Sequence, residues 1–139
     1  MKLSEYFEKT DGHGVIATAD SEGKVGAAVY ARPHFINEKT VAFIMADRLM
    51  HKNLQSNPHA SYLFMESNKE DAGRRLYLTK AKEEADRKLV DEMLRKEVCP
   101  VDEGYIKGKR YLVYFKIDKV LPLVGVREKK QVSVSHAIA

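Results

Sequence analysis

The hydrophobic positions of this chain either alternate with polar ones or form short apolar runs, and both patterns are typical of β-strands. Ser21-Glu22-Gly23-Lys24 separates the first two runs and predicts a hairpin turn with a positive φ at Gly23. Pro33, near the end of the second run, indicates an edge position or a bulge. Six runs predict strands: residues 15–20, 25–36, 40–46, 59–65, 75–80 and 110–120.

Helical spacing occurs in three segments. Residues 3–7 predict a short opening helix, which the glycines of residues 11–14 should end. A second short helix should begin at Asp47 as its N-cap and stop at Asn57-Pro58. The strongest helical pattern covers residues 83–98 and ends before a proline. Its apolar stripe consists of Leu89, Val90, Met93 and Leu94. Few helices among strands in mostly hairpin order predict a small antiparallel barrel.

The bulk properties describe one globular domain. At 139 residues the chain is expected to form a single domain, 1–139, with a loosely held C-terminal tail at 126–139. It has no apolar run long enough to cross a membrane and no signal-peptide core. The single cysteine, Cys99, excludes an internal disulfide, so a cytoplasmic location is expected. The net charge of +4 comes from cations interleaved with acids, so we expect neither a nucleic-acid nor a membrane partner.

Two predicted strands are apolar on both faces. In residues 40–46, Val41, Phe43 and Met45 alternate with alanines and an isoleucine, and residues 59–65 repeat the pattern. A strand that is apolar on both faces needs a cover on its outer face. That cover is either a helix of the same chain or a second subunit.

The positions of the basic residues are the main indication of a binding site in this sequence. The five histidines lack metal-ligand spacing, and neither a G-x-S-x-G elbow nor a phosphate-binding P-loop is present. Arg48 and Lys52 are four residues apart, on one face of the predicted second helix, with His51 beside them. Arg32 and Arg74-Arg75 add basic points on neighbouring strands. Each alone suits a solvated surface, but together they predict an anion-binding barrel.

Two segments carry a family resemblance. The first is Gly14-Val15-Ile16-Ala17-Thr18-Ala19-Asp20 with Gly23, which matches an opening "LATxDxxG" hairpin. The second is Asn53-Leu54-Gln55-Ser56-Asn57-Pro58-His59-Ala60-Ser61-Tyr62-Leu63-Phe64, which matches "NLxxNPxxSxLF". In this order, with residues 41–45 between them, they resemble the pyridoxamine 5'-phosphate oxidase-like group of FMN-binding split barrels. The resemblance covers about half of the chain, residues 14–81, with weaker support from 110–125.

The resemblance implies a mainly β (α+β) fold, a six-stranded antiparallel split β-barrel with flanking helices. It also implies a homodimer with FMN in clefts at the subunit interface. The phosphate-binding Ser-Arg-Lys triplet of the oxidases falls on Arg48, Leu49 and Met50, so only Arg48 matches in kind, and His51 and Lys52 follow in the next turn. The full set of cofactor-binding residues that it implies is Ala31, Arg32, Pro33, Ile44, Met45, Arg48, His51, Lys52 and Arg74.

The function implied is that of a flavoprotein, with FMN as cofactor and oxidoreductase activity on a small molecule. The tryptophan of the pyridoxal phosphate enzymes has no match, because the chain has none, so pyridoxamine-phosphate oxidase activity itself is not expected. Three alternatives stay open: a non-catalytic FMN carrier for electron transfer, the same barrel with a deazaflavin, and the same barrel with haem. A basic barrel that binds nucleic acid through Tyr105 and its neighbouring lysines ranks well below these.

Overall fold

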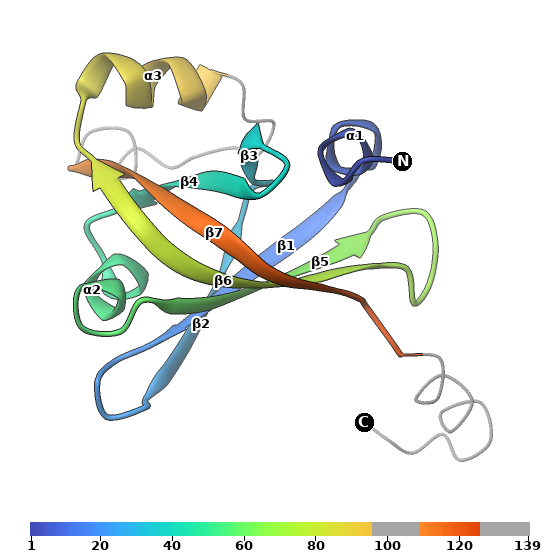
Figure 1. The fold of residues 1–139 in the computed structure, drawn as a ribbon, viewed down its shortest axis with the longest axis horizontal. Coiled ribbons are helices and arrows are strands. Elements are labelled where there is room, and N and C mark those ends of the chain that lie inside the picture. The colour runs from blue at the N-terminus through green and yellow to red at the C-terminus, as the bar shows by residue number, and fades with distance from the viewer. Residues whose placement is uncertain (96–108, 126–139) are drawn as a thin grey trace.

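Seven strands form one antiparallel sheet with two edges (Figure 1). The computed structural model describes residues 1–95 and 109–125, apart from the side chain of Leu94. The order across the sheet is β2-β1-β5-β6-β7-β4-β3. The strands are β1 (Gly12–Ala19), β2 (Val25–Tyr30), β3 (His34–Asn37), β4 (Thr40–Ala46), β5 (His59–Glu66), β6 (Gly73–Glu84) and β7 (Arg110–Pro122). The helices are α1 (Leu3–Lys9), α2 (Leu49–Ser56) and α3 (Arg87–Arg95). The predicted mainly β, split-barrel architecture is confirmed.

The prediction of six strands was wrong by one, because residues 25–36 form two strands. β2 pairs with β1, whereas β3 pairs with β4 at the opposite edge of the sheet. Pro33 lies buried in the link between them and has no N–H to donate to a ladder. The Tyr62 hydroxyl donates to the Ala31 carbonyl at 3.0 Å, so this link has side-chain support. The chain therefore changes edges where the sequence indicated only a bulge.

Two other boundaries differ from the sequence prediction. Gly12 and Gly14, expected in a loop, belong to β1, and Gly14 lies so close to the Tyr62 ring that a Cβ there would be 1.8 Å from the hydroxyl. β6 continues to Glu84, which pairs with Leu112, so α3 begins at Arg87 instead of residue 83. Pairing with the long strand β7 holds these residues extended, against their local helical pattern. The expected tail at 126–139 and the Tyr105 segment lie outside the described residues.

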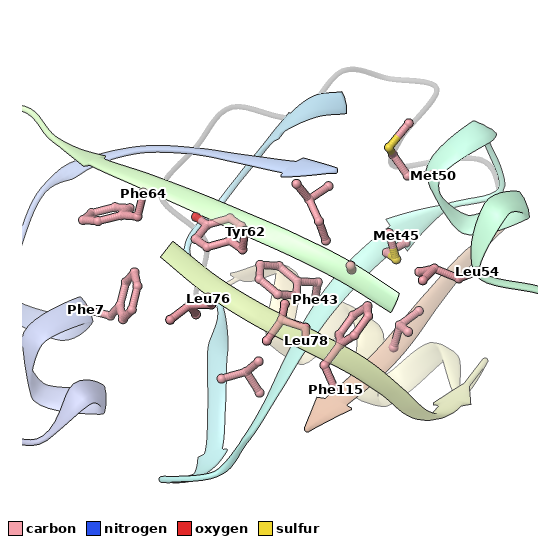
Figure 2. Close-up of a cluster of buried hydrophobic side chains, with 14 of the residues drawn as sticks. Phe7, Phe43, Met45, Met50, Leu54, Tyr62, Phe64, Leu76, Leu78 and Phe115 are labelled. Atoms are coloured by element: carbon pink, nitrogen blue, oxygen red, sulfur yellow. The ribbon is translucent and has the colours of Figure 1, made fainter. Parts of the chain in front are cut away.

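The main core fills the space between the strands, where side chains from most elements point toward one another (Figure 2). The Phe43 ring of β4 lies 5.0 Å from the Tyr62 ring of β5, and the Phe7 ring of α1 packs edge-on against Phe64 at 4.9 Å. α1, the opening helix that residues 3–7 predicted, therefore closes one end of this interior.

No helix among the described residues has the length and apolarity needed to span a membrane.

A helix, not a second subunit, covers the outer face of β4. Ala42 and Ile44 pack with Leu112 of β7 under Val90 of α3 in a second buried cluster. The alternative left open by the sequence is therefore decided for β4. On β5, by contrast, Ser61 and Leu63 are half-buried and Met65 is 38% exposed, so the described residues cover this outer face only in part.

Candidate phosphate-binding site at the start of α2

The chain leaves the buried strand β4 and enters α2 through Asp47 and Arg48. The Asp47 N–H donates to the carbonyl of Lys109 at 3.1 Å, so this residue extends the β4–β7 ladder. Arg48 is extended (φ −134°, ψ −170°) and takes the N-cap position, so the prediction of Asp47 as N-cap was wrong. Its carbonyl accepts the bond from Lys52 N–H at 2.9 Å. The physical reason is the pairing with β7, which keeps the chain extended one residue further.

The N-cap residue, Arg48, makes no side-chain capping hydrogen bond to the first turn of α2. The amides of residues 49–51 precede the first main-chain bond of the helix, and they carry the positive end of its dipole. Arg48 and Lys52 are both exposed beside this turn. A guanidinium, an ammonium and uncapped amides form a donor set that fits a phosphate monoester. Asp47, which is also exposed, is the one carboxylate in this short segment.

His51 is buried in a polar network, so it does not join the two exposed cations. Its side chain is 7% exposed and stacks on the Tyr111 ring at 4.0 Å with an interplanar angle of 6°. Its Nε2 lies 3.0 Å from Oε2 of Glu83 on β6. The Gln55 amide donates to Glu83 Oε1 at 3.1 Å, and the Lys80 ammonium donates to the same oxygen at 2.6 Å. These contacts fasten α2 to the end of β6.

The Glu83 carboxyl is the acidic centre of this network. Its partial burial acts to raise its pKa, but the hydrogen bonds from Lys80, Gln55 and His51 outweigh that effect and lower the pKa to about 2. Glu83 is therefore a carboxylate throughout the physiological range, and it can only accept hydrogen bonds.

The opposite side of α2 is held by β1. Asn53 is buried, and its amide donates to the Thr18 hydroxyl at 3.1 Å. That hydroxyl in turn lies 3.4 Å from the Met50 carbonyl oxygen. Polar contacts therefore hold α2 on two sides, with Met50 and Leu54 in the core beneath it.

The remaining predicted cofactor residues lie away from α2 or inside the fold. Ile44 and Met45 are buried on opposite faces of β4. The Arg32 guanidinium donates to the carbonyls of Phe7 and Thr10 at the end of α1, at 2.9 and 3.0 Å. The Arg32 side chain thus supports α1 in this structure.

Arg74 also contacts α1. Its guanidinium lies 4.0 Å above the Tyr6 ring, while the Tyr6 hydroxyl donates to Glu66 Oε2 at 2.5 Å. Burial and the Glu66 contact raise the pKa of Tyr6 above its usual range.

Arg74 pairs with Pro122 at one end of β7, whereas Ala46, next to the α2 site, pairs with Arg110 at the other. Twelve residues of strand separate these points, roughly 40 Å if fully extended.

The structure therefore divides the predicted residues into two groups within one chain. Arg48, His51 and Lys52 lie at α2, whereas Arg32 and Arg74 lie at α1, and the Ala31–Pro33 link crosses between the sheet edges. Sequence reasoning missed Glu83, because it was assigned to a helix. It also missed Tyr111, for which no local signal exists. The spacing of His51 and Gln55 by four residues was an available signal for their contact.

Comparison with solved structures identifies the fold. An FMN-binding protein from Syntrophomonas wolfei subsp. wolfei matches with a TM-score of 0.70 and 19% identity, over 91% of this chain and 86% of that one. An F420 reductase matches with a TM-score of 0.67 and 12% identity, over 84% and 94% of the two chains. The chain has the fold of the flavin-binding split barrels.

Other split barrels extend the range of cofactors. HutZ, the haem storage protein from Vibrio cholerae, matches with a TM-score of 0.57 and 16% identity, over 86% of this chain and 91% of that one. Two candidate pyridoxamine 5'-phosphate oxidases, from Lactobacillus delbrueckii and Listeria innocua, each match with a TM-score of 0.60. No protein-family model and no curated protein sequence matches the chain. The likeness thus fixes the fold and leaves the cofactor open.

Proposed function

We propose that this split barrel binds FMN and holds the phosphate of FMN at the start of α2. The observation that carries the proposal is the uncapped first turn of α2 with exposed Arg48 and Lys52 beside it. The FMN-binding protein with the same fold supports the choice of cofactor. Bound FMN would supply hydride and electron transfer, and the protein would bind and orient it. We propose an oxidoreductase acting on a small molecule, with a non-catalytic electron carrier as its competitor.

Titration with FMN and with riboflavin tests the phosphate site directly. Riboflavin lacks the phosphate, so the wild-type protein should bind FMN more tightly. Replacing both Arg48 and Lys52 by Ala should weaken FMN binding by at least about 100-fold, because two charged hydrogen bonds at about 1.5–3 kcal/mol each contribute about 3 kcal/mol or more. Riboflavin binding should change little. The control is Lys69→Ala, since Lys69 is exposed in the β5–β6 turn at the far end of β5.

Different results would refute FMN binding, the position of its phosphate and the catalytic role. If the wild-type protein neither quenches FMN fluorescence nor shows flavin absorbance, FMN is not its cofactor. If FMN binds but the double variant binds it equally well, the phosphate lies elsewhere. Steady-state turnover with NADH or NADPH and common acceptors distinguishes an enzyme from a carrier, because a carrier shows stoichiometric reduction only.

We further propose that the protein is a homodimer in which a second copy covers β2. This edge strand contains no charged residue, and Val25 and Val29 are 73% and 76% exposed. Exposed, uncharged edge strands invite pairing with another chain. A Cβ on Gly26 would be 3.3 Å from the end of Leu49, itself 57% exposed, so the apolar surface runs from β2 to the start of α2. A second copy on this surface would form a wall of the cofactor site.

Size-exclusion chromatography with light scattering of the wild-type protein and of Val29→Lys tests the dimer. The wild-type protein should have twice the 15.8 kDa mass of one chain, and the variant should be monomeric with weakened FMN binding. Asn68→Lys adds the same charge at an exposed position between β5 and β6 and serves as the control. A monomeric wild-type protein that binds FMN would refute the shared site.

The F420 reductase and HutZ favour two other ligands of the same barrel, a deazaflavin and haem. Competition with FMN separates them from the proposal. A deazaflavin or haemin that binds, and that FMN fails to displace, would favour the corresponding alternative.

A further inference from the structure

The imidazole of His51 lies in an unusual place for a residue of a cationic helix start. It is on the third residue of α2, yet it points into the protein, while Arg48 and Lys52 stay exposed. It is fixed in two directions at once. The Tyr111 ring stacks parallel to it, and Glu83 lies 3.0 Å from its Nε2.

The hydrogen-bond chemistry fixes the tautomer of this ring. Because Glu83 is a carboxylate and only accepts, Nε2 of His51 carries the proton that lies between them. The Gln55 amide, which also approaches Nε2, donates to Glu83 Oε1 at 3.1 Å and to the His51 carbonyl at 3.1 Å. Both the ring and the main chain of His51 are therefore tied to the same carboxylate. Nδ1 faces Asp47 Oδ1 at 3.8 Å, beyond hydrogen-bond range.

α2 depends on such contacts for its direction. At eight residues it is too short to be stable alone, so its tertiary contacts determine where its first turn points. Met50 and Leu54 bind it to the core, and Asn53 holds it on the β1 side. On the β6 and β7 side, the contacts of its first turn are those of His51 with Glu83 and Tyr111.

We infer that His51 and Glu83 are positioning residues, which aim the amides of the first turn of α2 and the Arg48 side chain at the phosphate of the cofactor. The inference rests on the proposed function. Neither residue contacts the phosphate in this scheme, and Glu83 would repel it. Their effect is to hold a pre-formed anion site, so that the protein favours a phosphorylated flavin over an unphosphorylated one.

The test compares the ratio of FMN to riboflavin affinity in the wild-type protein and four variants. His51→Phe keeps the ring stacked on Tyr111 but cannot donate to Glu83, and Glu83→Gln removes the charge with little change in shape. Each should lower the FMN affinity about tenfold, while the riboflavin affinity stays within about twofold, so the ratio falls. His51→Gln places an amide near the position of Nε2 and should restore much of the ratio. Tyr114→Phe is the control, since it loses a 3.2 Å hydrogen bond to Glu84 on the side of the sheet that faces α3.

A purely structural role predicts a different pattern. It would weaken FMN and riboflavin binding equally, whatever the melting temperature of the variants, and that result would overturn the inference. An unchanged ratio in both His51→Phe and Glu83→Gln would overturn it as well. A wild-type protein that binds no FMN refutes the proposed function first and the inference with it. A wild-type protein that prefers FMN, with variants that keep this preference, leaves the proposed function intact and refutes only the inference. The ³¹P resonance of bound FMN gives a second readout, because it should shift in His51→Phe and Glu83→Gln but not in Tyr114→Phe.

Discussion

Replacing Arg32 tests most directly whether this side chain binds the cofactor or supports α1. The family resemblance implies that Arg32 binds the cofactor, whereas the structure shows its guanidinium bound to the carbonyls of Phe7 and Thr10. Replacement of Arg32 by Met keeps the apolar stem and removes both hydrogen bonds. A hydrogen bond from a charged donor contributes about 1.5–3 kcal/mol. Because Arg32 is half-buried, we expect the pair to contribute about 2–4 kcal/mol to the free energy of unfolding.

The assay is denaturant and thermal unfolding followed by circular dichroism, with an FMN titration of the folded protein. For a chain of this size, about 1 kcal/mol shifts the melting temperature by about 4 °C, so Arg32→Met should melt about 10 °C lower. Its FMN affinity, measured well below that temperature, should stay within about threefold of the wild type. Arg87→Met, at an exposed position of α3, is the matched control. If Arg32→Met melts like this control but loses FMN binding, Arg32 acts on the cofactor and the structural reasoning fails.

Three further outcomes follow from other contacts. The lowered pKa of Glu83, about 2, means that its carboxylate stabilises the fold above pH 4.5 and that this stabilisation is lost as the pH falls toward 2. Glu83→Gln should therefore be less stable by about 1–2 kcal/mol at pH 7, and the difference should shrink in melts below pH 4. Gly14→Ala should leave little folded protein, because the Cβ would collide with the buried Tyr62 ring, whereas Gly26→Ala meets a flexible methionine end and should fold. Val90→Ala should lower the free energy of unfolding by about 2 kcal/mol, as a cavity at a 1% exposed position does, and an unchanged melt would contradict the packing of α3.

Local pattern was sufficient wherever an element is determined by its own residues. Residues 40–46 and 59–65 were predicted as strands and are β4 and β5, because every second side chain is large and apolar. Gly23 adopts the predicted positive φ, +83°, since the hairpin requires it. The stripe of Leu89, Val90 and Met93 packs on the sheet as the helical period requires.

Pattern failed where pairing with a distant strand overrode local preference. The local pattern predicted that Glu83 and Glu84 begin a helix. Pairing with β7 keeps both residues extended instead, and this places Glu83 beside His51. The candidate site shows the same division. Arg48 and Lys52 were predicted from their spacing to lie together at the start of this helix, and both are exposed there. The burial of His51 depends on Tyr111, sixty residues away in sequence, and could not be predicted.

The sequence by itself determined the strands, the basic start of α2 and the resemblance to FMN-binding split barrels, since these depend on residues that are neighbours in the chain. Only the tertiary structure decided that residues 25–36 reach both edges of the sheet. It alone showed that α3 covers β4, and that Arg32 and Arg74 support α1 instead of lying beside Arg48 and Lys52. Each of these depends on the register of strands distant in sequence. A long strand such as β7 separates side chains that a linear pattern treats as one group.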